Sequence, residues 1–205
     1  MNKKTTILSV LLFSLFFISC KTDSKKTLNN SSKATTYSIE PLTTKIGWTA
    51  YKTTDKVAVK GEFTKINITP KQASSAKEVL NGLEFSIPVS SIFSNNEERD
   101  GKLKKFFFGI MDKTELVSGT ISTTSENKGT ASITMNGITH SFLIEYMISG
   151  QMITLSGTLN LDDFNASSAI ESLNKVCFDQ HKGADGISKT WSDVKIDVAT
   201  YLKVE

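Results

Sequence analysis

The sequence contains very few cysteines, prolines and histidines. Only Cys20 and Cys177 are cysteine among 205 residues, and Cys20 stands at the end of an N-terminal apolar run. If Cys20 is modified at that position, Cys177 has no partner and no intramolecular disulfide can form. The fold must then be held by its core alone.

The shortage of histidine counts against most enzyme classes. His140 follows a turn, and no motif places a serine or a carboxylate beside it, so a rim or surface position is expected rather than a catalytic base. The stretch "CFDQH" places Cys177, Asp179 and His181 at alternate positions, which could face one metal ion on an extended segment. No second pair of ligands accompanies them, so we expect no metal site.

Other signatures of catalysis are also missing. Asp162 and Asp163 are adjacent, and on a strand they would point to opposite faces instead of forming an acid/base pair. We expect them to end a strand, with Asp163 or Asn165 bonding to local backbone. No phosphate loop and no dinucleotide fingerprint occurs. The expectation is therefore a protein without catalytic activity or cofactor.

A strongly basic fold is absent as well. The whole chain has 24 basic and 21 acidic side chains, but six of the lysines and only one aspartate precede Tyr37. The remainder carries 18 basic and 20 acidic groups. Phosphate binding needs clustered positive charge on the folded face, so a nucleic-acid partner is not expected.

The N-terminus has the pattern of an export signal. Lys3 and Lys4 precede a short apolar run, and Ser19 stands before Cys20. The run ending in Ser19-Cys20 resembles a bacterial lipobox, with Phe17 as a departure from the usual pattern. Residues 1–19 are therefore expected to be a lipoprotein signal peptide, with Cys20 as the lipid anchor and first mature residue.

The next stretch, residues 20–36, is rich in lysine, serine, threonine and asparagine. It has too few apolar residues to offset the entropy of ordering, which predicts a flexible tether. Residues 37–205 are long enough for one domain with a sizeable core. We therefore expect an exported lipoprotein of the cell envelope, facing the periplasm or the outside.

Within residues 37–163 apolar residues alternate with a period of two, which is typical of half-buried strands. The clearest hairpin flanks Asn136-Gly137, a pair that favours a tight turn. A change of parity near Thr64-Lys65 predicts a bulge, and Pro88 predicts an edge or a bend. About eight strands with one apolar face each predict an all-β fold, either a closed antiparallel barrel or a two-sheet sandwich.

Three short helices are expected between the strands. Ser75 with Glu78, and Ser168 with Glu171, have the spacing of capping boxes at residues 74–82 and 167–174. In "NNEERDGKLKK" an asparagine precedes acidic and then basic residues, as a helix dipole favours, although Gly101 predicts that this helix is short. Its charges should face water. At least two of the three phenylalanines that follow it should be buried at one end of the barrel.

Several segments together resemble the YceI-like family of exported bacterial proteins. They are the "W-x-A-x-K" strand at 48–52, the stretch "SSIFSNNEERDGKLKKFFF", the hairpin "ASITMNGITHSF" and the strand end "GTLNLDDFN". The similarity runs from Tyr37 to Leu202 and rests on the order and spacing of these segments. Lys102 stands where the family often has histidine, and Asn165 where it favours glycine.

The resemblance implies a lipocalin-like antiparallel barrel of about eight strands that holds an isoprenoid or similar amphiphilic lipid. Small residues on the inward face (Ala50, Gly61, Ala131 and Gly157) would leave room along the axis, although they could equally fit the taper of a filled barrel. The residues expected to line the apolar cavity are Trp48, Phe63, Phe85, Ile87, Phe106, Phe107, Phe108, Ile133, Phe142 and Leu155.

Two roles are open for Arg99-Asp100. They could hold the connection to the barrel as an ion pair or a cap, or Arg99 with Lys102 could meet the head group of a ligand. The expected function is binding or carriage of a hydrophobic ligand without chemistry. The alternative is an envelope interaction protein with a filled barrel that binds a partner through its loops. The sequence does not define the oligomeric state.

Overall fold

The computed structural model describes residues 34–205, which form one compact unit. The expected signal peptide, Cys20 and all but the last three residues of the expected tether lie outside the described residues. Thr36 and Glu205 exchange backbone hydrogen bonds of 2.9 and 3.0 Å, so the described chain begins and ends side by side.

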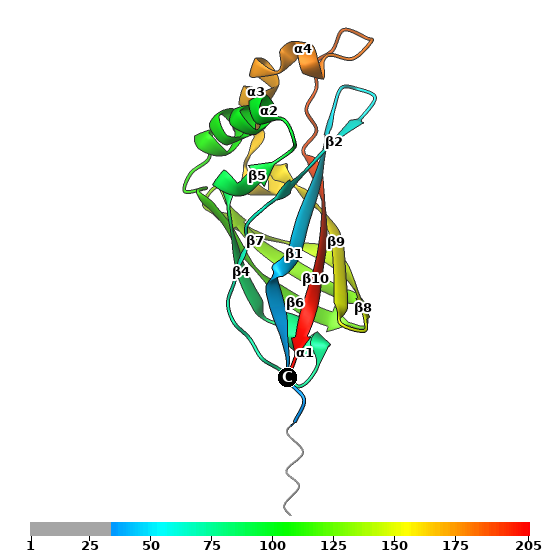
Figure 1. Cartoon of the computed structure of the whole chain (residues 1–205). Helices are drawn as coiled ribbons and strands as arrows, with labels where there is room; N and C mark the ends of the chain where they lie inside the picture. Colours follow the sequence, from blue (N-terminus) through cyan, green and yellow to red (C-terminus); the bar gives the residue numbers. More distant parts are fainter. Residues whose placement is uncertain (1–33) are drawn as a thin grey trace, which may run out of the picture. The chain divides into compact units, whose positions relative to one another are not determined.

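Antiparallel strands make up most of this unit (Figure 1). They are β1 (Tyr37–Lys52), β2 (Val57–Phe63), β3 (Asn67–Ile68), β4 (Leu83–Pro88), β5 (Ile92–Phe93), β6 (Leu116–Ser125), β7 (Lys128–Met135), β8 (Ile138–Ser149), β9 (Met152–Asn160) and β10 (Asp193–Val204). They form one ten-stranded sheet in the order β3-β4-β6-β7-β8-β9-β10-β1-β2-β5.

This sheet curls until its two ends meet. β2 and β3 are successive parts of one bent segment, and β4 and β5 are parts of another, joined through a short 3-10 turn, η1 (Val89–Ser91). β2 pairs with β5 at one end of the order, and β3 pairs with β4 at the other. The ten strands therefore build an eight-segment barrel, which confirms the expected fold. The predicted bulge is the bend at residues 64–66, and Pro88 ends β4 at the second bend.

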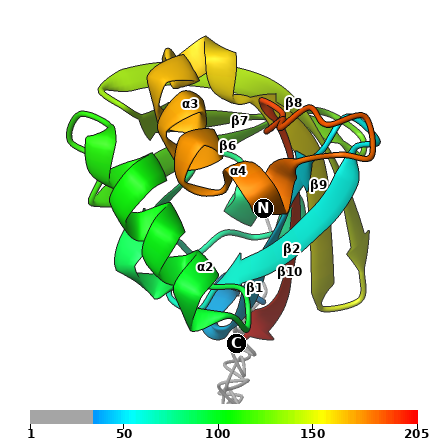
Figure 2. The same cartoon turned by 90° about the horizontal axis from the view of Figure 1, so that it is seen from above.

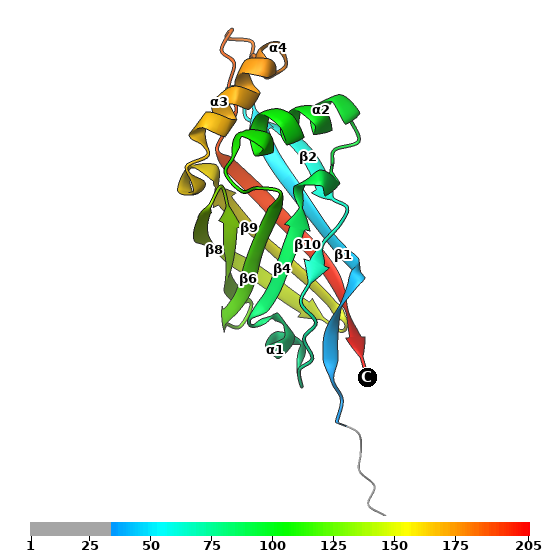
Figure 3. The ribbon, with the colours of Figure 1, turned by 90° about the vertical axis from the view of Figure 1, so that its left-hand side faces the viewer.

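Short helices occupy both ends of the barrel. They are α1 (Ala76–Leu80), α2 (Glu97–Lys102), the π-helical turn η2 (Leu103–Phe107), the 3-10 turns η3 (Phe108–Ile110) and η4 (Leu161–Phe164), α3 (Ser167–Val176) and α4 (Phe178–His181). α1 lies at the end where the described chain begins and ends, and α2, α3 and α4 lie at the opposite end (Figures 1 and 3). Seen from above, these three helices surround that end of the barrel (Figure 2).

Two local predictions are confirmed. Ser75 is the N-cap of α1 and accepts a hydrogen bond from the backbone N–H of Glu78 at 3.3 Å. Asn136 and Gly137 both have positive φ, 53° and 69°, as the tight turn between β7 and β8 requires. The Asn136 side chain also donates to the carbonyl of Phe164 at 2.8 Å, which joins this turn to η4.

The helix predictions for residues 95–105 and 167–174 need correction. Asn96 caps α2 as expected, but the helical path continues through η2 and η3 to Ile110, because packing of the phenylalanines on the barrel outweighs the cost of Gly101. Asp100 is buried instead of facing water. The N-cap of α3 is Ala166, which makes no side-chain hydrogen bond, so the predicted capping role of Ser168 is wrong.

No helix within residues 34–205 combines the length and the apolar character needed to cross a membrane.

Candidate functional site

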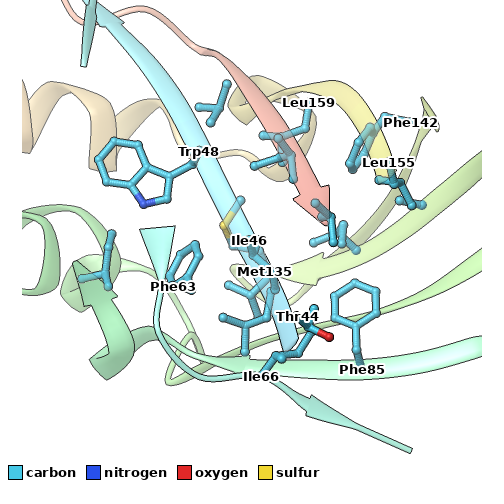
Figure 4. Close-up of a pocket in the computed structure, with 18 of the residues that line it drawn as sticks. Thr44, Ile46, Trp48, Phe63, Ile66, Phe85, Met135, Phe142, Leu155 and Leu159 are labelled. Atoms are coloured by element: carbon cyan, nitrogen blue, oxygen red, sulfur yellow. The ribbon is translucent and has the colours of Figure 1, made fainter. Parts of the chain in front are cut away.

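The barrel encloses a long apolar cavity. Its volume is about 210 Å³, roughly fifteen times the space that one water needs. Apart from three threonines, every lining residue is aliphatic, aromatic or methionine. Side chains from strands around the barrel point into this space (Figure 4). The barrel is therefore hollow and its interior is apolar. The sequence alone also allowed a barrel filled by side chains.

The structure places nine of the ten predicted cavity residues on this wall: Trp48, Phe63, Phe85, Ile87, Phe107, Phe108, Ile133, Phe142 and Leu155. Phe106 is the exception. It is half-buried outside the cavity, with the ammonium of Lys105 5.0 Å from its ring centroid. Phe107 and Phe108 are buried and stack edge to face at 4.8 Å, as expected for two of the three phenylalanines.

The small residues on the inward face have two different roles. Ala50 and Ala131 line the cavity, which agrees with the first of the two roles that the sequence left open. Gly61 and Gly157 do not line it, because large side chains lie over them. A Cβ on Gly61 would come within 2.2 Å of Trp48 Cζ2, and one on Gly157 within 2.9 Å of Phe142 Cε2. These two glycines therefore leave space for aromatic rings of the cavity wall and do not widen the cavity itself.

The cavity is closed at the end that carries α1. Val79 and Leu80 of this helix are buried under the barrel, and Leu80 is part of the cavity wall. The segment before α1 is fastened to the first strand by two backbone hydrogen bonds between Tyr37 and Ala73. A ligand would therefore enter from another side.

At the opposite end the cavity adjoins a second pocket of about 170 Å³, lined by charged, polar and apolar side chains, which we call the vestibule. It lies between the end of β1, α2, α3 and α4. Five residues line both spaces: Trp48, Ala50, Leu103, Leu173 and Thr190. Part of the wall therefore belongs to both the apolar cavity and the vestibule. Together they form a site that is apolar inside the barrel and carries charged groups at the vestibule end.

The vestibule is positively charged. Lys52, Arg99 and Lys102 line it, with Glu98 as the one carboxylate on its wall. Glu98 pairs with Lys102 at 2.6 Å. Within residues 34–205, neither Lys52 nor Arg99 forms an ion pair, although Lys52 Nζ donates to the carbonyl of Gln180 at 2.8 Å.

The titration of nearby groups reflects this environment. Burial, reinforced by the charges of Lys52 and Lys102, lowers the pKa of His181 from 6.5 to about 4, so its ring is neutral at pH 7. The ring Nδ1 lies 2.7 Å from Thr190 Oγ1, on the shared wall. Burial raises the pKa of Cys177, and the cationic groups Lys102, Lys52 and Arg99 act in the opposite direction. The Cys177 thiol is therefore protonated at neutral pH.

The structure separates the roles of the Arg99-Asp100 pair. Asp100 is buried, and its Oδ1 accepts hydrogen bonds from Ser94 N at 2.9 Å and Ser94 Oγ at 2.6 Å. It fastens α2 to the end of β5. Arg99 lies in the vestibule, where Nη1 reaches only the carbonyl of Ser94 at 3.5 Å. Lys104 and Lys105, on the adjoining turn η2, do not line the vestibule.

Among the remaining polar candidates, His140 and Asp163 lie apart from this site. His140 is exposed and lies 3.3 Å from Asp163, so this carboxylate contacts a side chain, whereas the sequence predicted that Asp163 or Asn165 bonds to local backbone. "CFDQH" is helical from Phe178, so Cys177 and His181, four residues apart, both line the vestibule, whereas Asp179 does not. Within the part of the chain that the structure describes, no group of three or more histidine, cysteine or acidic side chains is arranged to hold a metal.

Sequence reasoning missed Lys52 as a vestibule residue. It belongs to the "W-x-A-x-K" strand, but no local pattern shows that the end of β1 meets α2 and α4. It also missed the donor on Trp48. Among residues 34–205 the buried Nε1–H of Trp48 has no hydrogen-bond partner, whereas that of Trp191 donates to the Thr53 carbonyl at 2.8 Å.

An antiparallel barrel with an apolar interior and a polar mouth defines the class of lipocalin-like hollow barrels. A family model described as YceI-like domain matches residues 37–201. The chain belongs to the YceI-like family.

Solved structures share the fold at low sequence identity. A polyisoprenoid binding domain from Saccharophagus degradans, implicated in plant cell wall breakdown, aligns with a TM-score of 0.57 and 12% identity over 82% of this chain and 98% of that one. BcnA from Burkholderia cenocepacia aligns with a TM-score of 0.52 and 14% identity over 80% and 99%. No curated protein matches the sequence significantly.

Proposed function

We propose that this protein binds and carries an isoprenoid-like or other amphiphilic lipid inside its barrel, as a lipoprotein of the cell envelope. The single observation that carries the proposal is the apolar cavity, which runs from α1 to the vestibule and is lined by nine of the residues predicted for a ligand wall. Apolar ligands gain free energy in proportion to the apolar surface removed from water. A long hydrocarbon chain matches such a cavity.

The comparisons support the same class of ligand. The Saccharophagus domain is described as polyisoprenoid binding, and this chain covers 98% of it. We infer a carrier without catalysis, because the polar groups beside the cavity are held in structural contacts. His181 bonds to Thr190 before β10, and Asp100 bonds to Ser94 after β5, so both side chains fasten helices to the barrel.

Lipid extraction followed by mass spectrometry tests the proposal. Protein purified without detergent should release an apolar molecule in a near-stoichiometric amount, and the emptied protein should bind isoprenoid probes again. Ala50 lies on the wall between cavity and vestibule, so Ala50→Trp should block the cavity and abolish retention.

Ala58 supplies a matched control. Ala58 belongs to β2, pairs with Tyr51 of β1 and is exposed on the outer surface. Ala58→Trp therefore adds the same side chain without entering the cavity. Ala58→Trp should retain the lipid. A protein that carries no apolar molecule and binds no isoprenoid probe would refute the carrier function.

The anchoring of the protein is a separate part of the proposal. It rests on the basic, apolar and Ser19-Cys20 segments of the N-terminus. Labelling with a fatty-acid analogue in cells should mark the wild type and Cys177→Ser but not Cys20→Ser. Labelling that persists in Cys20→Ser would refute lipidation at this residue.

A further inference from the structure

We infer that the vestibule selects amphiphiles whose polar end is an anion, a carboxylate or a phosphate, over neutral amphiphiles of the same length. This inference rests on the proposed function, because the vestibule lies at one end of the proposed lipid cavity. It identifies Lys52, Arg99 and Lys102 as the group that attracts the head.

The first argument is the unbalanced charge of the vestibule. Three cations and one carboxylate share a space of about 170 Å³. Of these three cations, only Lys102 has an ion-pair partner within residues 34–205, and this partner, Glu98, is largely exposed, with 75% of its side chain open to solvent. Two cations at a partly enclosed site therefore remain for an incoming anion, and charge-assisted hydrogen bonds to an anion are the strong ones.

The second argument is the position of these charges at the end of an apolar cavity. Leu103 and Leu173 line both spaces, so the cations lie just beyond the wall at this end of the apolar cavity. Arg99 and Lys102 project from α2, while Lys52 ends β1, so the positive groups approach from two sides. A ligand with an apolar tail and one anionic end satisfies both regions at once.

The third argument is the buried indole N–H of Trp48. Trp48 is 7% exposed and lines both the cavity and the vestibule, and its Nε1 has no hydrogen-bond partner within residues 34–205. An unpaired buried donor is unfavourable. An oxygen of a carboxylate or a phosphate ester at this junction would accept from it, whereas a plain hydrocarbon would not.

Glu98 has a predictable effect in this arrangement. Its carboxylate already occupies Lys102, so an anionic head must compete with it. Removing the carboxylate should therefore improve binding of an anion, while removing the cation should weaken it. Two neighbouring substitutions on one helix should thus act in opposite directions.

A pair of probes that differ only in charge tests the inference. cis-Parinaric acid and its methyl ester have the same fluorescent chain, so their dissociation constants compare an anionic with a neutral end. For the delipidated wild-type protein we expect the acid to bind about tenfold more tightly, the scale of one charge-assisted hydrogen bond. The preference should shrink as salt concentration rises.

Variants assign the preference to the vestibule. Arg99→Gln and Lys102→Gln should each reduce it, and together they should make acid and ester bind equally. Glu98→Gln should increase it. Lys104→Gln is the matched control, because Lys104 is exposed on the adjoining turn outside the vestibule, and it should leave both constants unchanged.

The outcomes separate this inference from the proposed function. If neither probe binds, the lipid cavity itself is refuted. If both bind equally in the wild type, or if Lys104→Gln acts like Lys102→Gln, the cavity stands and the anion preference is refuted. Inorganic phosphate should not displace the acid at millimolar concentration, and displacement would reassign the vestibule to a free anion.

Discussion

The indole of Trp48 covers the α-carbon of Gly61, its partner on the neighbouring strand β2. A Cβ on Gly61 would lie 2.2 Å from Trp48 Cζ2 and 2.8 Å from the carbonyl oxygen of Phe93. The wall of the cavity at this point depends on a residue without a side chain. The same contact holds the indole at the junction between cavity and vestibule.

Gly61→Ala should therefore destabilise the barrel by about 1–3 kcal/mol, because one of the two clashing groups is backbone and cannot move aside. The free energy of unfolding in urea measures the effect. Gly101→Ala is the matched control, since a Cβ there meets nothing within 4 Å and the position is helical. It should stabilise by about 0.5–1 kcal/mol. Equal effects of the two substitutions would contradict this account of Gly61.

Phe107→Ala should cost about 3–5 kcal/mol, because Phe107 is buried on the cavity wall and packs edge to face on Phe108. Phe106→Ala removes the same side chain from a half-buried position outside the cavity and should cost clearly less. Chemical denaturation of both variants compares them. If Phe107→Ala changed lipid retention with little loss of stability, this residue would act as a gate.

Asp100→Ala should destabilise by about 1–3 kcal/mol, because it leaves the backbone N–H and the hydroxyl of Ser94 without their acceptor. Asp100→Asn keeps an oxygen in the same place and should cost less. Glu97→Ala, at an exposed position of the same helix, should change stability by a few tenths of a kcal/mol. Thermal unfolding of the three variants decides whether Asp100 fastens α2 to β5.

The depressed pKa of His181 predicts a loss of stability in mild acid. The unfolded chain binds a proton near pH 6.5 and the folded one only near pH 4, so the unfolded state holds more protons between these values. The contribution of neutral His181 is present in full above pH 6.5 and is lost as pH falls toward 4. The difference in unfolding free energy between wild type and His181→Gln should shift across this window. An imidazole NMR titration with a midpoint near 6.5 would contradict it.

Local signals predicted local structure well. The positive φ angles at Asn136 and Gly137 follow from a two-residue turn, and the Ser75 cap follows from its own helix. Alternation predicted most of the cavity wall, because inward residues of a barrel recur at every second position. Phe106 departs from this pattern, because it lies in a π-helical turn whose orientation is set by packing.

The features that the sequence did not predict depend on contacts between residues far apart in the chain. The helix beyond Gly101 is held by contact of Phe107 and Phe108 with the barrel, which no helix propensity includes. Ser168 matched a capping box, but the chain enters α3 two residues earlier, after the turn at Asn165. Lys52 reaches the vestibule only because the barrel brings the end of β1 to α4.

The backbone hydrogen bonds between Thr36 and Glu205 place both ends of the described chain at the α1 end of the barrel. The vestibule lies at the other end, beside α2 and α4. A ligand that passes through the vestibule would therefore cross the domain at the end farthest from Thr36, where the described chain begins.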